Sequence, residues 1–289
     1  MLNFEWFVAD VVKEAKVMLP GYEVRFDVVE KYGRNYEAFV VTGNGGVSMM
    51  VNAEEVYKAY AGKELSFEEV IDQLVEMVQD MPTINREFVD DWSRIKNLLF
   101  FACFPYDEKM AEKVPCEVIT NDKGCGIMVV SKFLYYMDKH GFGSVTVNNK
   151  MLENWGIDKE QLKAATLESG PKLFPVEVKN LIDLTSYDDS VPGYLVVTNK
   201  EMVDGAGSIF YPEVISRVQS RLFGSRDFLI IPSSRHEVIV APDSGEADYA
   251  FIRSMVQMVN ASGDCVSERD FLSNELFRYN FKKGKIEVV

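Results

Sequence analysis

"FLIIPSSRHEVIVAP" (residues 228–242) decides the class of fold, because two apolar runs flank a short polar segment. Runs of Phe, Leu, Ile and Val bounded by Pro and Ser are typical of β-strands. We therefore predict antiparallel strands at 228–231 and 237–241, joined by a turn at 232–235. Pro232 fits the end of the first strand, since proline has no N–H to donate to the ladder. A hairpin of this kind implies an antiparallel sheet.

The segments around the hairpin alternate between strand-like and helix-like patterns. Residues 116–147 read as two or three strands joined by turns, and residues 4–15 as an amphipathic helix. Residues 85–104, which are rich in apolar residues in their second half, predict another helix. Residues 246–262 predict a late helix, and we expect its apolar side to line the core. That side consists of Phe251, Met255, Met258 and Val259.

These patterns predict an α+β fold with mixed, mostly antiparallel sheets and flanking helices. The chain has 289 residues, enough for one large domain or two medium ones. We predict an N-terminal α+β region at 1–110 and a C-terminal α+β region at 111–289. One continuous domain is the alternative.

The charge of the chain is acidic, with 45 Asp and Glu against 31 Lys and Arg and a formal net charge of −14. Such a charge repels nucleic-acid backbones and anionic membranes, so we expect neither as a partner. A protein partner or a small molecule remains open, and a solvated acidic surface is the ordinary explanation of the charge.

The cysteines and histidines predict neither a metal site nor a cofactor. The four cysteines, of which Cys265 is the last, contain no C-x-x-C pair, and only two histidines are present. His140 lies in a turn-like segment and is expected to be an exposed turn residue. The first residues lack the pattern of a signal peptide, and no stretch has the length of a membrane span. We therefore expect a cytoplasmic protein.

The hairpin also places serines beside His236, which raises the question of a catalytic cluster. A Ser–His nucleophile pair needs an acidic residue to orient it and an oxyanion hole, and the sequence locates neither. No G-x-S-x-G elbow is present. We therefore predict no catalytic residues here.

Ligand binding is a separate possibility, because two polar loops follow strand-like segments. The loop at 232–237 offers Ser233, Ser234, Arg235 and His236 as exposed donors, and the loop at 198–208 offers Asn199 and Asp204. If the two loops meet, they could bind a small anion. The alternative is that Asn199 and Asp204 simply hold turns.

Two functions from different classes remain. The first is a non-enzymatic interaction or accessory protein without a cofactor, and it is the one we favour. The second is a small-molecule-binding protein or an enzyme that uses the 198–208 and 232–237 loops. A concave pocket lined by the loop residues would favour the second function, and a flat acidic or apolar patch the first.

Three stretches resemble one bacterial family in their order and spacing, namely "NNKMLENWGIDKEQLKAATLESGPKLFPVEV" (148–178), "YLVVTNKEMVDGAGSIFYPEVISRV" (194–218) and the hairpin at 228–242. The family is the one catalogued as domain of unknown function 5688. The resemblance covers residues 114–285 well and the N-terminal third more loosely. It implies an α+β fold and a cytoplasmic bacterial protein. It implies no particular reaction, substrate or catalytic residue.

Overall fold

A computed structural model describes the chain except for residues 1, 32–33, 44–47, 80–85, 139–140, 182–192, 223–225, 244, 263–265 and 268. The predicted turn at His140 and the thiol of Cys265 lie outside the described residues. The chain forms two compact units, Met1–Val89 and Asp90–Val289, and each is described by itself.

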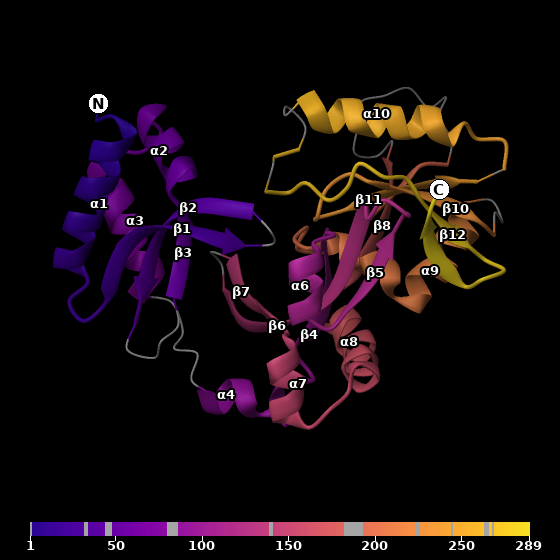
Figure 1. Cartoon of the computed structure of the whole chain (residues 1–289), viewed down its shortest axis with the longest axis horizontal. Helices are drawn as coiled ribbons and strands as arrows, with labels where there is room; N and C mark the ends of the chain where they lie inside the picture. Colours follow the sequence, from indigo (N-terminus) through magenta and orange to yellow (C-terminus); the bar gives the residue numbers. More distant parts are fainter. Residues whose placement is uncertain are drawn as a thin grey trace. The chain divides into compact units, whose positions relative to one another are not determined.

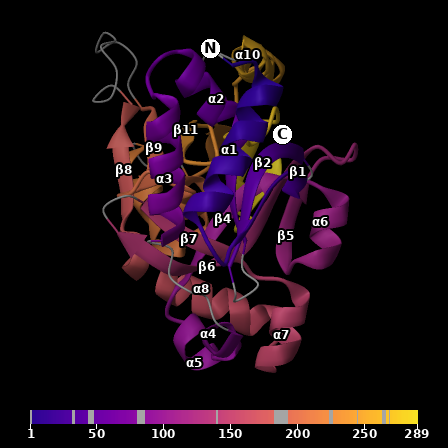
Figure 2. The ribbon, with the colours of Figure 1, turned by 90° about the vertical axis from the view of Figure 1, so that its left-hand side faces the viewer.

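The first unit is an antiparallel three-stranded sheet with helices packed against it (Figures 1 and 2). Its elements are α1 (Phe4–Met18), β1 (Glu23–Lys31), β2 (Arg34–Thr42), β3 (Ser48–Asn52), α2 (Ala53–Ala61) and α3 (Phe67–Gln79). The strand order is β1-β2-β3, so β1 and β3 are the edge strands.

Apolar spacing and caps explain the helices of this unit. In α1, Phe7, Val11 and Ala15 recur at helical intervals and are fully buried. Ser66 accepts a hydrogen bond from the backbone of Glu69, whose carboxylate accepts one from the backbone N–H of Ser66. This capping box opens α3.

The second unit contains two antiparallel sheets with helices between and around the strands (Figure 1). Helix α4 (Arg86–Asp90) ends at the first residue of this unit. The first part of the unit then comprises α5 (Trp92–Ile95), β4 (Leu99–Pro105), α6 (Glu108–Lys113), β5 (Cys116–Thr120), β6 (Gly126–Asp138), β7 (Gly141–Thr146), α7 (Asn149–Trp155) and α8 (Lys159–Leu173). The later part comprises β8 (Val176–Asn180), β9 (Leu195–Asn199), the 3₁₀ helix η2 (Gly205–Phe210), α9 (Pro212–Arg221), β10 (Phe228–Pro232), β11 (Val238–Pro242), α10 (Tyr249–Ser262), β12 (Phe277–Asn280) and β13 (Lys285–Val288).

The smaller sheet corrects the second half of the prediction of a helix over residues 85–104, whose first half contains the short helices α4 and α5. Strand β6 pairs with β4, β5 and β7, and β4 occupies residues that were expected to be helical. Every residue of β4 except Pro105 is buried. On one side of β4, Phe100 packs with Phe174, which directly follows α8. On the other side, Phe101 belongs to a larger apolar cluster that includes residues of η2. A strand buried on both faces is continuously apolar and loses the alternation that identifies a strand.

The larger sheet has the order β13-β12-β10-β11-β9-β8 and contains the hairpin at its centre. Strands β10 and β11 are antiparallel, with Phe228 opposite Pro242 and Pro232 opposite Val238. The predicted hairpin and the predicted α+β fold are therefore confirmed. The turn is shifted by one residue relative to the prediction, because Pro232 still belongs to β10 and Glu237 precedes β11.

Helix α10 exists as predicted, but its apolar side does not line the core. The exposed fractions are 60% for Phe251, 45% for Met255, 66% for Met258 and 41% for Val259. Val256 is its one buried residue. Figure 1 shows α10 running along the outside of the second unit. In the part of the chain that the structure describes, no helix is both long and apolar enough to cross a membrane.

Candidate functional site

The candidate site lies where the segment after β9 meets the loop between β10 and β11. Asp204 precedes η2 in the left-handed backbone conformation, with φ 51° and ψ 21°. Gly205 follows it, and an added Cβ there would lie 2.4 Å from both the carbonyl oxygen of His236 and the hydroxyl of Thr198. The two loops therefore touch at backbone level, and only glycine fits at position 205.

A buried ion cluster joins these loops to the smaller sheet. The Oδ2 atom of Asp204 lies 2.6 Å from Nζ of Lys132, which belongs to β6. Its Oδ1 atom lies 2.6 Å from Nη2 of Arg235, in the β10–β11 loop. The exposed fractions of the three side chains are 2% for Asp204, 7% for Lys132 and 10% for Arg235. One carboxylate therefore links two sheets through two short charge-assisted bonds.

The surroundings of the cluster keep Asp204 ionised. Burial by itself raises the pKa of a carboxyl group, but Lys132 and Arg235 outweigh it and lower the pKa of Asp204 to about 2. The guanidinium carbon of Arg235 also lies 4.5 Å from the ring centroid of Phe104, within cation–π range. Arg235 is predicted from the sequence to be an exposed donor. That prediction is wrong, because the side chain is buried and forms an ion pair with Asp204.

His236 forms a second polar pair next to the cluster. Its Nδ1 atom accepts a hydrogen bond of 3.1 Å from the backbone N–H of Asp204. The proton of a neutral ring therefore lies on Nε2, which is 2.9 Å from Oδ1 of Asp270. Ser267 donates to the other oxygen of Asp270. Hydrogen bonds from Ser267 and His236 outweigh partial burial and lower the pKa of Asp270.

The remaining predicted residues also contact the protein itself. Asn199 holds a turn, because its amide donates to the carbonyl of Val203 at 2.8 Å and its oxygen accepts from the N–H of Val203. The hydroxyl of Ser234 accepts from the backbone N–H of His236, and that of Ser233 donates to Glu237. The structure thus brings the two predicted loops together. Ligand binding stays a prediction for the six residues proposed from the sequence, namely Asn199, Asp204, Ser233, Ser234, Arg235 and His236.

The chemistry open to this arrangement is limited by its internal contacts. The histidine has an acidic partner, as in a catalytic triad, but its other ring nitrogen binds a backbone N–H and not a hydroxyl or thiol. A cavity next to Ala206 and Pro232 holds about 10 Å³, the space of one water at most. Among the described residues no group of three or more His, Cys, Asp or Glu is placed to hold a metal ion, and metal independence stays a prediction.

Lys132 and Asp270 are the members of the site that sequence reasoning missed. Lys132 is the one charged residue in the apolar stretch "GIMVVSKFLYYM" (126–137) of β6. A lysine is almost never buried without a partner, so its presence there signals a buried carboxylate elsewhere. Asp270 has no comparable signal, since it lies in an irregular polar segment.

Comparisons with known proteins agree with the resemblance seen in the sequence. The model of a family of unknown function, DUF5688, matches residues 4–281. Neither the curated proteins nor the solved structures contain a significant match.

Proposed function

This chain belongs to the family of unknown function DUF5688, and we propose that it is a non-enzymatic interaction protein of the bacterial cytoplasm. We propose further that it binds a protein partner through the exposed apolar face of α10, which consists of Phe251, Met255, Met258 and Val259. The observation that carries the proposal is that this apolar face is exposed to solvent.

The apolar face of α10 is continuous along the helix. Its members are four, seven and eight positions after Phe251, so they lie on one side. Their exposed fractions, 41–66%, leave on the order of a few hundred Å² of apolar surface, the size at which a patch marks an interaction site. Methionine and phenylalanine are also enriched in the centres of protein interfaces.

The charge of α10 is concentrated away from this face. Arg253 is the one charged residue among its fourteen. The guanidinium of Arg253 contacts the carboxylate of Glu275 at 3.2 Å and donates to the carbonyl of Val289. The chain as a whole is 26% charged, so the uncharged face differs from the rest of its composition.

These properties favour a protein partner over a lipid surface. Helices that lie in a membrane interface carry Lys and Arg on their polar side, whereas α10 is preceded by Glu246 and Asp248. An uncharged face also lets an acidic protein approach a partner without repulsion between like charges in the contact. The partner face that fits is apolar and uncharged.

Affinity purification from the source organism tests the proposal. The bait proteins are the wild-type chain, the variant Phe251→Ser/Met255→Ser/Met258→Ser, and the control Met50→Ser/Met77→Ser/Val118→Ser. The control removes three exposed apolar side chains that lie on three different elements. We expect a protein retained by the wild type and the control to be lost from the α10 variant. Analytical ultracentrifugation of the purified chain shows whether that protein is a second copy.

Two results would contradict the proposal. One is an identical set of retained proteins for the wild type and the α10 variant. The other is loss of the partner from the control as well, which would indicate nonspecific adhesion of exposed apolar residues. The circular dichroism spectrum should be unchanged and the melting temperature only slightly lowered in the α10 variant, because each replaced side chain is at least 45% exposed.

Small-molecule binding at the loops is the alternative function, and the meeting of the two loops favours it. The ring of His236 and the carboxylate of Asp270 are about one-third exposed, at 31% and 32%. A ligand would have to compete with the contacts that both groups already make. A rise in melting temperature with an anionic metabolite, lost in His236→Gln, would support this alternative.

A further inference from the structure

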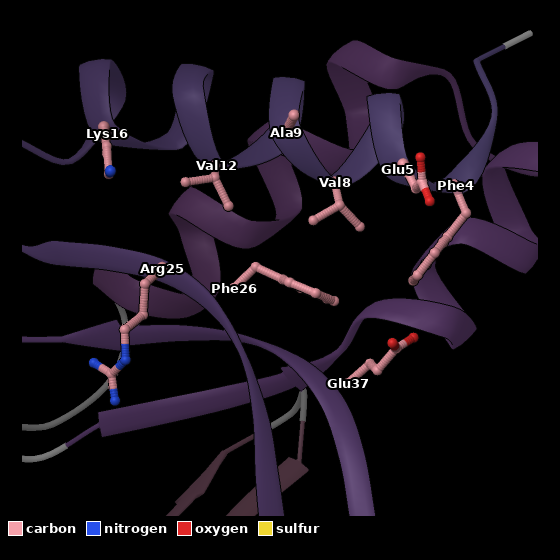
Figure 3. A pocket seen from close by; sticks show the side chains of 9 residues that line it. All are labelled: Phe4, Glu5, Val8, Ala9, Val12, Lys16, Arg25, Phe26 and Glu37. Carbon is pink, nitrogen blue, oxygen red and sulfur yellow. The ribbon is translucent and has the colours of Figure 1, made fainter.

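A separate groove lies in the first unit, between α1 and the edge strand β1. It has a volume of about 640 Å³, within the range of ligand-binding sites. Phe4, Val8 and Val12 line it from α1 and Phe26 from β1 (Figure 3). The rings of Phe4 and Phe26 meet edge to face at 6.2 Å and form an apolar floor.

The charged residues of the groove are distributed unevenly between its ends. Figure 3 shows Glu5 and Glu37 at one end and Lys16 and Arg25 at the other. The guanidinium of Arg25 lies 3.4 Å from both Glu23 and Asp27, so its charge is offset. No contact of this kind engages Glu5 or Glu37 among the described residues. Among the residues that the structure describes, one end of the groove is therefore acidic and its two carboxylates are without an ion-pair partner.

The strand beside the groove can also accept an extended chain. Within the described part of the unit, β1 pairs with β2 alone, which leaves its outer backbone groups at the sheet edge. Glu5 and Lys16 are eleven positions apart in α1, or roughly 16 Å at the rise of a helix. An extended peptide covers this length in about five residues.

We propose that the groove between α1 and β1 binds an extended peptide segment of a partner protein, with a basic residue against Glu5 and Glu37 and apolar residues on the Phe4–Phe26 floor. Addition of a strand to a sheet edge, with alternate side chains in a groove, is an established mode of peptide recognition. Helix α10 does not supply this cation, because Arg253 contacts Glu275.

Fluorescence anisotropy with the full chain and a labelled heptapeptide tests the proposal. The peptide has lysine at position one, leucine at three and five, glutamate at seven and threonine elsewhere. A second peptide has glutamate in place of the lysine. We expect the lysine peptide to bind the wild-type chain at least about fivefold more tightly, since two carboxylates face its cation.

Charge reversal in the protein locates the binding. The variant Glu5→Lys/Glu37→Lys should reverse the preference, so that the second peptide binds more tightly. The control Glu68→Lys/Glu76→Lys makes the same change of net charge on α3, outside the groove, and should keep the wild-type preference. The α10 variant should also keep it, which separates this proposal from the proposed function. Absence of saturable binding, or an unchanged preference in Glu5→Lys/Glu37→Lys, would overturn the proposal.

Discussion

Replacement of Asp204 by asparagine should destabilise the second unit by about 3 kcal/mol. The variant keeps the shape of the side chain but removes the negative charge between Lys132 and Arg235. Both cations are at least 90% buried, so water cannot replace the lost partner. Removing one member of a buried ion pair typically costs about 3–5 kcal/mol. We take the lower value because the asparagine oxygen can still accept one hydrogen bond.

Urea unfolding followed by tryptophan fluorescence measures the loss of stability of the second unit, which contains Asp204. Trp92 and Trp155 belong to the second unit and lie 5.3 Å apart between ring centroids. Trp6 belongs to the first unit, so the measurements are made in a Trp6→Phe background. The unfolding midpoint and slope then refer to the unit that contains the ion cluster.

A matched control separates burial from ion pairing as such. Lys163 and Glu117 form an ion pair of 2.7 Å, nearly the distance of the buried pairs, with side chains 56% and 50% exposed. Lys163→Gln should cost less than about 1 kcal/mol, because water screens the pair. A loss in Asp204→Asn no larger than in Lys163→Gln would refute our account of the cluster. In a double-mutant cycle, Lys132→Met should cost less stability when Asp204→Asn is already present.

Three further predictions follow from the same region. The lowered pKa of Asp204 contributes roughly 2 kcal/mol of stability, which is complete above about pH 5 and is lost as the pH falls through 2. The stability gap between wild type and Asp204→Asn in urea unfolding should therefore narrow on acidification. Gly205→Ala should cost at least about 2 kcal/mol in thermal unfolding because its Cβ would meet backbone at 2.4 Å, whereas Gly245→Ala, with open space around it, should cost about 1 kcal/mol for its φ of +78°. Tyr211→Phe should cost about 1–3 kcal/mol because the buried N–H of Phe101 would lose its acceptor, and a neutral effect in urea unfolding would contradict this.

The parts of the fold that sequence could predict are those set by local contrast. The hairpin at 228–242 was predicted to within one residue, because apolar strands there alternate with a polar turn that contains Pro232. Strand β4 was missed because it has no contrast: both of its faces are buried, so an apolar run of that length fits a helix equally well. The missing information is the presence of α8 on one side of β4 and η2 on the other.

The candidate site was predictable only in its local parts. Asn199, Asp204 and the 233–236 loop were chosen because polar residues follow strand-like segments, and the structure brings these loops together. Their partners come from far along the chain: Lys132 is 72 residues from Asp204, and Asp270 is 34 residues from His236. Such contacts depend on how the sheets pack, which no local pattern records. A lone lysine in an apolar strand predicts that a partner exists but does not identify it.

Helix α10 was predicted correctly as a helix, but the prediction that its apolar side lines the core is wrong. Periodicity identifies which side of a helix is apolar, but it does not say what covers that side. In a helix that packs only against the core of its own domain, the apolar side faces the core and the charged side chains face water. In α10 the single charge, Arg253, is held against Glu275 while Phe251 and Met258 are exposed. With about two-thirds of each side chain exposed, the loss relative to full burial is roughly 1–2 kcal/mol for each residue, and a bound partner would recover it. The exposed apolar side therefore supports our proposal that α10 binds a protein partner.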